Sequence, residues 1–516
     1  MKIDKKKIYK IVFLFAIFLA ILVRTYRFGV VPGGMNQDGA MAAVDAKALA
    51  DYGTDRFGMK YPVHLTAWGF GQMSALLSYL MVPAIRIWGL SVFSARLPML
   101  LVSLASLGLV YLFVKDSAGE RLALVVFLLT AINPWHIIQS RWAIDCNLFP
   151  HFLLAGICLL NRGSDGKKTS LYLSMVFFAL SMYCYGISIY TVPIILLFSC
   201  IMLLRRKLIT FRQACFAAAV YFLLAWPFIA CMIINAFGFN SIETPFFTIP
   251  YFPYSMRSGD ILFFSEEPLT QLQRNAEALF QILFQIYRGP AWNEIRGFGT
   301  LYPFSVPFML TGMVILFRHT RKNTGAALTI IWFLTAVAEG LITANVNINR
   351  INMIFYPLII FTGTGIYAVF HICSENRILR YLRFLLPAAY LTVFCIFTFT
   401  YFTSYARQAS EDFMQDFGTA VTSIKGSDAE KIYISADAQY KGFSHVSEIL
   451  SLFYLDIDAK YYQSGAFHDR FTFHIPSDPD PSENAVYVAA ADDMQRFPDE
   501  LYNAVSYGKF LVVTPK

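Results

Sequence analysis

The chain has 516 residues, of which 57% are hydrophobic, 16% aromatic and only 15% charged. Soluble domains carry about 25% charged residues, so the composition excludes a protein that is water-soluble throughout. The net charge of +8 is unevenly distributed, because residues 404–516 hold 9 Lys or Arg against 17 Asp or Glu. The basic residues of the remaining chain are scattered among short loops, which argues against nucleic-acid binding.

Apolar runs close to the roughly 20 residues that cross a bilayer recur up to residue 402. They predict a polytopic α-helical membrane protein with about eleven transmembrane helices. The first run follows five lysines and leads into "RTYRFG" without a small-residue cleavage site, so we interpret it as an uncleaved span. The expected spans lie near 8–24, 95–114, 121–138, 148–161, 170–186, 189–204, 214–236, 303–317, 325–343, 352–372 and 384–402.

The loops between these spans alternate in character. One set is short and basic, and the positive-inside rule places it in the cytoplasm together with the N-terminus. Its members are 115–121, 162–168, 205–212, 318–322 and 377–383. The other set then faces outward and contains two large loops, 25–94 and 237–302. This topology places the C-terminus outside the cell membrane.

The run 73–90 is ambiguous, because it is apolar but contains Pro83 and Arg86. If it were a span, every later basic loop would face outward. We therefore interpret it as a shorter interfacial helix within the outer loop 25–94.

The acidic tail predicts a soluble, extracytoplasmic α/β domain over 404–516, separate from a transmembrane domain over 1–403. The sequences "KIYISA" (431–436), "AVYVAA" (485–490) and "FLVVTP" (510–515) are typical of strands. The sequence "SHVSEILSLFYL" (444–455) has the periodicity of an amphipathic helix, and 476–484 is rich in turn residues.

A single carboxylate, Asp38, follows the first span in "VVPGGMNQDGAMAAVDAKAL". The Ala-rich stretch after "PGG" predicts a helix with Asp38 in its first turn. The simplest interpretation is a helix-capping or first-turn acid, which the helix dipole favours.

Other polar residues occur at the same depth, at the outer ends of the spans. Charges at the membrane interface are costly to desolvate unless they meet each other or a ligand. The alternatives are that Lys60 and Arg350 are interfacial anchors and that His64 is a local hydrogen-bonding residue. The candidates, besides Asp38, are Lys60, Tyr61, His64, Arg141, Asp145 and Arg350.

Several ordered pieces of this sequence resemble the polytopic GT-C glycosyltransferases, in particular glycosyltransferase family 39. That family includes protein O-mannosyltransferases and aminoarabinose transferases that act on lipid A. The matching pieces, within residues 8–375, are "NQDGA", "KYPVHLTAWG", "WGLSVFSARLPMLL", "AINPWHIIQSRWAID" and "NRINMIFYPLIIFTGTGI". Where the family commonly has Asp-Glu, this chain has Asp38-Gly39, so the resemblance predicts that Gly39→Glu is tolerated if the loop keeps the same helical turn.

The resemblance implies a GT-C-like fold and transfer of a sugar from a polyprenyl-phosphate donor to an acceptor hydroxyl at the outer face, with inversion. Asp38 would be the general base, and Lys60 and Arg350 would contact the lipid phosphate. Tyr61, His64 and Arg141 are further candidates for substrate binding. Asp145 would orient the acceptor or Arg141, or would help Asp38 to hold a divalent metal, which is possible but not implied.

The acceptor would be a glycan, a lipid or a protein of the cell envelope. Two other classes of function stay open from the residues alone. One is a transporter or flippase for lipid-linked glycans, and the other is a non-catalytic envelope-assembly protein. A cluster of Asp38, Asp145, Lys60 and Arg350 at the outer surface would favour the transferase.

Overall fold

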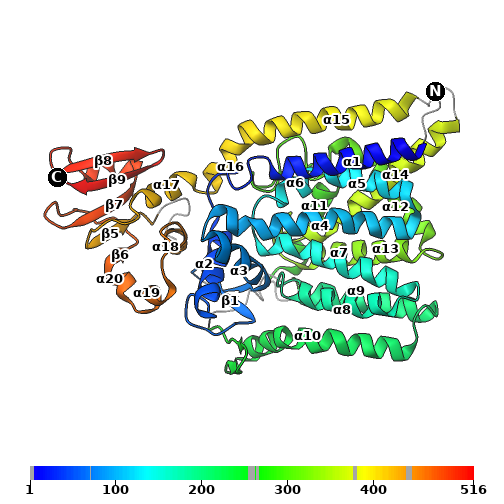
Figure 1. Ribbon diagram of the computed structural model, residues 1–516, viewed down its shortest axis with the longest axis horizontal. Helices are drawn as coiled ribbons and strands as arrows, with labels where there is room; N and C mark the ends of the chain where they lie inside the picture. The colour runs from blue at the N-terminus through cyan, green and yellow to red at the C-terminus, as the bar shows by residue number, and fades with distance from the viewer. Residues whose placement is uncertain (1–4, 70, 254–261, 263–265, 376–380, 437–443) are drawn as a thin grey trace.

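The computed structural model describes residues 5–69, 71–253, 262, 266–375, 381–436 and 444–516. A bundle of long helices forms one part of the molecule, and the C-terminal α/β domain lies at one end of it (Figure 1). The start of α1 (Lys5–Thr25) lies at the opposite end of the bundle. Arg377 and Arg380, from the last expected basic loop, lie outside the described residues.

A helix occupies each of the expected spans, and the prediction of a polytopic helical membrane protein is confirmed. Seven helices within the described residues are long and apolar enough to cross a membrane by length and composition. The helices over the expected spans are α1, α4 (Val92–Ala118), α5 (Glu120–Ala131), α7 (Asp145–Ser164), α8 (Lys168–Met182), α9 (Ser188–Arg205), α10 (Phe211–Phe237), α12 (Val306–His319), α13 (Thr324–Ile342), α14 (Phe355–Glu375) and α15 (Leu382–Thr400).

The expected span 121–138 is shorter than predicted. Helix α5 ends at Ala131, and a separate short helix, α6 (Pro134–Gln139), follows it. Pro134 occupies the first turn of α6, and the side chain of Asn133 accepts a hydrogen bond from the backbone N–H of His136. Proline is favoured at a helix start but cannot donate within a helix interior, so this cap divides the apolar run.

The basic turns gather at the end of the bundle that holds the start of α1. Tyr9 in α1 donates a hydrogen bond to the backbone oxygen of Glu120, the first residue of α5. Arg162 bonds to Asp116 in the same region, and the side chain of Asn323 donates to the backbone oxygen of Ser117. Arg206 donates to the backbone oxygen of Thr320. These turns therefore lie at the same end of the bundle as the start of α1, as the alternating loops predicted.

The outer loop 25–94 is an ordered layer between the bundle and the C-terminal domain (Figure 1). It contains α2 (Gln37–Tyr52), a hairpin of β1 (His64–Thr66) and β2 (Gln72–Ser74), and α3 (Leu76–Trp88). Helix α3 has 13 residues and lies beside α2. This length and place agree with the interfacial helix expected over 73–90.

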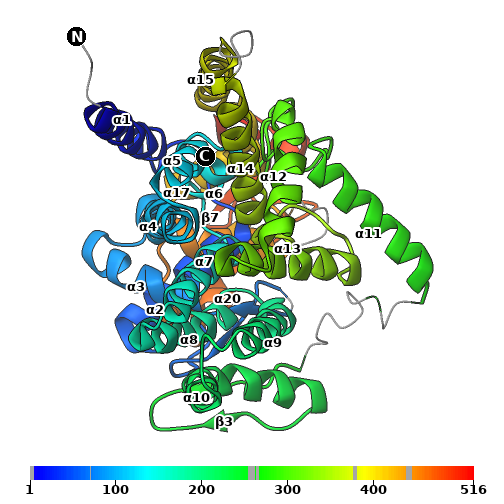
Figure 2. The ribbon, with the colours of Figure 1, turned by 90° about the vertical axis from the view of Figure 1, so that its right-hand side faces the viewer.

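The second outer loop contains a helix that the sequence analysis did not predict. After the short strands β3 (Ile242–Glu243) and β4 (Thr248–Ile249), α11 (Pro268–Leu283) lies at the periphery of the bundle (Figure 2). The side chain of Asn275 in α11 donates to the backbone oxygen of Leu341, near the end of α13. Most residues of α11 are exposed, so the helix offers only a narrow apolar stripe to the bundle.

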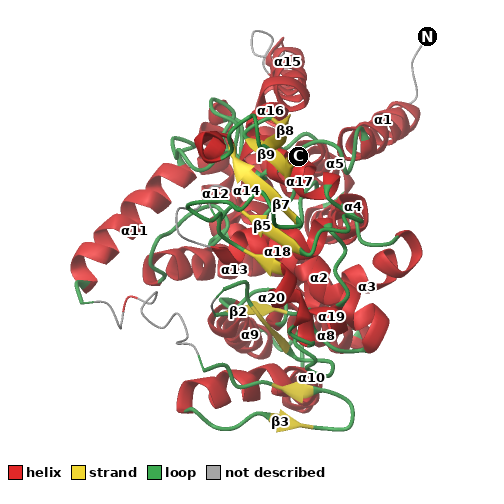
Figure 3. Cartoon of the chain, turned by 90° about the vertical axis from the view of Figure 1, so that its left-hand side faces the viewer, coloured by secondary structure: helices red, strands yellow, loops and turns green. Residues whose placement is uncertain are grey.

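The C-terminal domain contains a five-stranded mixed sheet with the order β6-β5-β7-β9-β8 (Figure 3). The strands β5 (Lys431–Ile434), β7 (Ala485–Ala490) and β9 (Phe510–Pro515) confirm the three that were expected, and α18 (Ser444–Tyr454) confirms the helix. Strands β6 (Phe471–Thr472) and β8 (Tyr502–Tyr507) were not predicted. Four residues of β8 in succession are exposed, so it lacks the alternation that marks a half-buried strand.

The remaining helices either connect the bundle to the C-terminal domain or belong to that domain. Helix α15 continues through a π-helical turn (Tyr401–Tyr405) into α16 (Ala406–Asp412), so the helical run passes the boundary expected near residue 403. The domain also contains α17 (Gln415–Ser423), α19 (Ala459–Gln463), α20 (Ala466–Arg470) and a 3-10 helix (Ala491–Arg496).

Candidate active site

Asp38 lies in the first turn of α2, where the sequence predicted it. The N-cap position is Asn36, whose side chain makes no capping hydrogen bond, so Asp38 is not the cap itself. The Oδ1 atom of Asp38 accepts a 2.5 Å hydrogen bond from Nε1–H of Trp68, in the loop after β1. The side chain of Asp38 is half-buried.

The first turn of α2 lies directly on the segment that leads to Asp145. A Cβ built on Gly39 would stand 2.7 Å from the backbone oxygen of Ala143. Real Cβ atoms do not approach a backbone oxygen so closely, so glycine permits this contact. A side chain at residue 39 would have to displace the Ala143 carbonyl or α2, so we expect Gly39→Glu to be disfavoured, contrary to what the resemblance predicts.

Asp145 is the first residue of α7 and precedes the apolar span 148–161. Its Oδ1 atom accepts a 2.7 Å hydrogen bond from the backbone N–H of Cys146. Burial raises the pKa of Asp145 to about 7, the negative charge of Asp38 adds to this effect, and hydrogen bonds from Cys146 and Ser74 oppose it. Two carboxylates that interact in this way resist ionising together, so Asp145 holds a proton for part of the time at neutral pH.

The two candidate cations for the lipid phosphate, Lys60 and Arg350, differ in their exposure to solvent. Lys60 is exposed, and its Nζ donates a 2.8 Å hydrogen bond to the backbone oxygen of Pro245 in the second outer loop. Tyr61 beside it is also exposed. Both side chains therefore lie at the surface between the two outer loops.

Arg350 is half-buried, and its Nη1 donates a 2.6 Å hydrogen bond to the backbone oxygen of Ala344. It lies within electrostatic reach of Glu339, near the outer end of α13, and of Tyr185, in the turn between α8 and α9. Tyr185 also interacts with Asp145. Tyr185 therefore lies within electrostatic range of both Arg350 and Asp145.

Two of the predicted residues occupy sites that do not suit contact with a phosphate. Arg141 is fully buried, and its guanidinium makes five hydrogen bonds to backbone oxygens at the end of α1 and in the turn after it, on Val23, Arg24, Tyr26 and Val31. His64 is buried against the rings of Phe228 and Phe252. Burial lowers the pKa of His64 to about 4, so its imidazole is neutral at pH 7.

Two of the sequence pieces that carry the family resemblance contact each other in the core behind the carboxylates. Nε1–H of Trp135 donates a 2.5 Å hydrogen bond to Oδ1 of Asn352, and Nδ2 of Asn352 donates to Oδ1 of Asn147 at 2.9 Å. Tyr356 lies within hydrogen-bonding distance of both His136 and His151. These buried groups fix α6, α7 and the start of α14 relative to one another.

Sequence reasoning missed Trp68, Ser74 and Tyr185 as neighbours of the carboxylates. Trp68 lies in the "KYPVHLTAWG" piece. This piece belongs to the same loop, 25–94, as Asp38, and that was the available signal in the sequence. Ser74 and Tyr185 carry no signal of their own, because only the folded chain brings them to Asp145. Within the described ranges, no group of three or more His, Cys, Asp or Glu residues is placed to hold a metal ion.

Residues 70–231 match the family of dolichyl-phosphate-mannose-protein mannosyltransferases. Two solved structures are similar over almost the whole chain. ArnT from Cupriavidus metallidurans bound to undecaprenyl phosphate has a TM-score of 0.57 at 12% identity, covering 99% of this chain and 98% of that one. The Archaeoglobus fulgidus oligosaccharyltransferase in the apo form has a TM-score of 0.55 at 12% identity, covering 96% and 71%.

The chain shares its fold with these two proteins, as the resemblance to the GT-C glycosyltransferases implied. The family match over 70–231 agrees with the resemblance to glycosyltransferase family 39. The expectation of a helical membrane fold of this kind is confirmed, and the match over 70–231 agrees with the expectation of a glycosyltransferase. No curated protein matches the sequence closely enough to count as a relative.

Proposed function

We propose that this protein transfers a sugar from a polyprenyl-phosphate donor to an acceptor hydroxyl at the outer face of the cell membrane, with inversion at the anomeric carbon. The observation that carries the proposal is that the charge of Asp38, in α2, acts on the buried carboxyl of Asp145. Helix α2 lies at the end of the bundle nearest the C-terminal domain (Figure 1). The solved relative that binds undecaprenyl phosphate supports a donor of this kind.

Asp38 is the general base in this proposal. The acceptor oxygen attacks the anomeric carbon, and its proton passes to Asp38. The bond from the anomeric carbon to the phosphate oxygen breaks, and the lipid phosphate leaves with the bonding electrons. In-line attack on the face opposite the leaving group inverts the configuration. The N–H of Trp68 donates to Oδ1 of Asp38 and so orients the carboxylate that receives the proton.

The other polar residues assist this step. Asp145, with its pKa near neutrality, can accept or donate a hydrogen bond to the acceptor. Arg350 and Lys60 bind the lipid phosphate, since Arg offers a bidentate fork and Lys a point charge. We leave Arg141 and His64 out of the donor site, because the donors of Arg141 are used by backbone oxygens and His64 carries no charge at pH 7.

The proposal includes the orientation of the chain. The basic turns lie at the same end of the bundle as the start of α1, and the C-terminal domain lies at the other end (Figure 1). The positive-inside rule then places the N-terminus in the cytoplasm and both the C-terminal domain and the carboxylates outside.

The test is transfer by membranes that contain an Asp38→Asn variant. The donors are undecaprenyl phosphates that carry radiolabelled mannose, glucose, galactose or arabinose, and the one that wild-type membranes consume is used throughout. Asn keeps the shape of the side chain but cannot accept a proton, so transfer should fall by about 10²–10⁴-fold. Asp51→Asn, at the other end of α2, is the control, because Asp51 is exposed and pairs only with Lys47 among the contacts described.

Near-normal transfer by Asp38→Asn would remove Asp38 as the base. A chain that moved labelled lipid-linked glycan across the membrane, with no transfer to any acceptor, would instead be a transporter.

A further inference from the structure

The loop that contains Trp68, the hydrogen-bond partner of Asp38, is fixed to α2 by a buried ion pair. Asp45, two turns after Asp38, lies 2.5 Å from Nη1 of Arg56, and both side chains are buried. Nη2 of Arg56 donates to the backbone oxygens of Thr66 and Ala67 at 2.9 and 3.1 Å. These residues directly precede Trp68, so the indole that contacts Asp38 is attached to α2 at a second point.

The C-terminal domain packs on this same loop. Gly69 has a φ of +69°, and a Cβ there would lie 2.8–2.9 Å from the ring of His445 at the start of α18. Nε2 of Gln463 donates a 3.2 Å hydrogen bond to the backbone oxygen of Arg56. The C-terminal domain therefore contacts both the residue after Trp68 and the arginine that supports it.

The start of α2 is attached to the turn after α16. The backbone N–H of Met35 donates to the backbone oxygen of Phe413 at 2.8 Å, and that of Gly33 donates to Oγ of Ser410 at 2.9 Å. Arg96 in α4 donates to the backbone oxygens of Pro32 and Gly34 at 2.6 and 2.8 Å.

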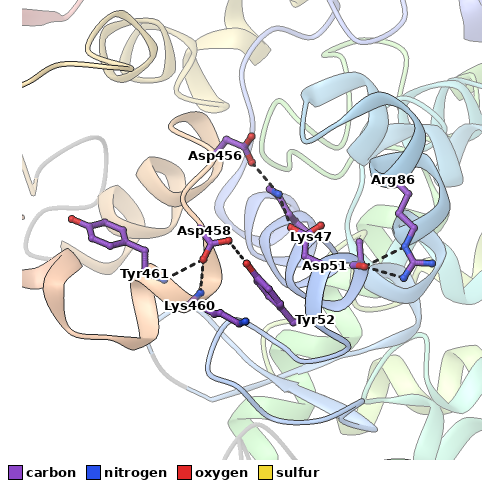
Figure 4. Close-up of polar contacts among 9 residues, drawn as sticks. Lys47, Asp51, Tyr52, Arg86, Asp456, Asp458, Lys460 and Tyr461 are labelled. Atoms are coloured by element: carbon purple, nitrogen blue, oxygen red, sulfur yellow. Dashed lines mark hydrogen bonds and ion pairs between the residues drawn. The ribbon is translucent and has the colours of Figure 1, made fainter.

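The end of α2 contacts the loop before α19 and the first turn of that helix (Figure 4). The hydroxyl of Tyr52 donates a 2.6 Å hydrogen bond to Oδ2 of Asp458, and Nζ of Lys460 lies 4.4 Å from the centre of the Tyr52 ring. Lys47 lies 3.8 Å from Asp456. The helix that carries Asp38 is thus held by the C-terminal region at its start, at its end and through the Trp68 loop.

We propose that Trp68 is a positioning residue for the carboxylate of Asp38, and that the C-terminal domain holds this carboxylate in its reactive orientation by docking on α2 and on the Trp68–Gly69 turn. The inference rests on the proposed role of Asp38 as base. Proton transfer requires hydrogen-bonding reach, and a misplacement of about 1 Å can cost about 10²-fold in rate. A domain that holds α2 at its start, at its end and through the Trp68 loop limits such misplacement of the carboxylate.

The first experiment is Trp68→Phe, which keeps an aromatic ring and removes the N–H. The kcat for transfer should fall by about 10- to 100-fold, the rate equivalent of one hydrogen bond to a charged group. The KM for the labelled undecaprenyl phosphosugar should stay within about twofold, because Trp68 positions the base and not the lipid. Trp88→Phe, at the exposed end of α3, is the control and should leave both constants unchanged.

The second experiment tests the contact with the C-terminal domain. Tyr52→Phe and His445→Ala remove surface groups from the interface, and each should lower kcat by about threefold at an unchanged melting temperature. Combined with Trp68→Phe, His445→Ala should cause no further loss, because both act on one carboxylate. His474→Ala, an exposed histidine of the same domain, is the control.

The outcomes separate this inference from the proposed function. An inactive Asp38→Asn variant together with a wild-type kcat for Trp68→Phe would overturn the positioning role and leave the base in place. Additive losses from Trp68→Phe and His445→Ala would overturn the role of the C-terminal domain. An active Asp38→Asn variant would remove the base, and the inference would fall with it.

Discussion

Gly39 packs against the backbone carbonyl of Ala143 so closely that a Cβ would stand 2.7 Å from the oxygen. This contact joins the turn that carries Asp38 to the segment that leads to Asp145, more than a hundred residues later in the chain. The pair of carboxylates depends on the absence of a side chain at this position, and the first prediction follows from that dependence.

Gly39→Ala should lower the melting temperature and reduce transfer at least tenfold, and Gly39→Glu should be worse. The added atoms must displace α2 or the Ala143 carbonyl, and overpacking of this kind costs about 1–3 kcal/mol. Thermal unfolding in detergent and the transfer assay measure the two effects. Gly108→Ala on α4, where a Cβ meets nothing within 4 Å, should be neutral or slightly stabilising. A fully active Gly39→Glu enzyme would contradict the contact.

Arg141→Ala should destabilise the protein by about 3–5 kcal/mol and should leave the KM for the lipid donor unchanged in the folded fraction. Its loss leaves buried backbone oxygens at the end of α1 without donors. Thermal unfolding measures the first effect and donor titration the second. Arg121→Ala, an exposed arginine at the start of α5, is the control. A normal melting temperature with a raised KM would return Arg141 to the donor site.

Arg350→Ala should raise the KM for the labelled undecaprenyl phosphosugar about tenfold or more, because a phosphate loses its charge-assisted hydrogen bonds. Arg350→Lys should recover part of the affinity, since Lys keeps the charge but not the fork. Arg296→Ala, an exposed arginine in the second outer loop, serves as the control. If the KM stayed normal in Arg350→Ala, this residue would be an interfacial anchor.

The stability of the protein should fall as the pH rises from 5 to 8, in part through Asp55. Burial, helped by the charge of Asp45, raises the pKa of Asp55 to about 7, against about 3.9 in an unfolded chain. The folded state therefore holds this proton more tightly, and the stabilisation is complete below pH 4 and lost as the pH passes 7. Its size is at most about 4 kcal/mol.

Asp55→Asn tests this pH dependence, because the Asn oxygen can still accept the N–H groups of Phe57 and Met59 that bond to Oδ1. Melting temperatures measured between pH 5 and 8 should fall less steeply for this variant than for the wild type. Parallel curves would show that Asp55 does not titrate in this range.

A membrane-impermeant maleimide added to intact cells should label a cysteine at Ser482 and miss cysteines at Arg206 and Arg321. The first position lies in the C-terminal domain, and the other two lie in or beside the turns that gather near the start of α1. Variants in a background without reactive native cysteines provide the measurement. Labelling at Arg206 from outside would overturn the proposed orientation.

Much of the architecture could be predicted from the sequence because it depends on local properties. The length of the apolar runs predicts the membrane helices, and the periodicity of the tail predicts β5, β7, β9 and α18. The sequence also predicted Asp38 in the first turn of a helix, since Ala-rich helices begin readily after "PGG". Helix α11 and strand β8 escaped prediction, because the first keeps most of its residues exposed and the second lacks alternating burial.

The partners of the polar side chains were decided only by the tertiary structure. Arg141 and Arg350 have the same side-chain chemistry and both follow or precede an expected span, yet Arg141 is surrounded by the backbone oxygens at the end of α1. Arg350 instead donates to the backbone oxygen of Ala344 and lies within electrostatic range of Tyr185 and Glu339. Sequence periodicity reports which face of an element is buried, but the partner of a buried charge depends on which distant segment packs there.

The sequence by itself determined the class of this protein, the number of apolar runs and the end of the bundle at which the basic turns gather, because hydrophobicity and charge act residue by residue. Only the tertiary structure decided that Asp38 meets Trp68 and Asp145, and that the C-terminal domain fixes α2. Those contacts arise from the close packing of segments far apart in the chain, and at Gly39 this packing leaves no room for a Cβ beside the Ala143 carbonyl.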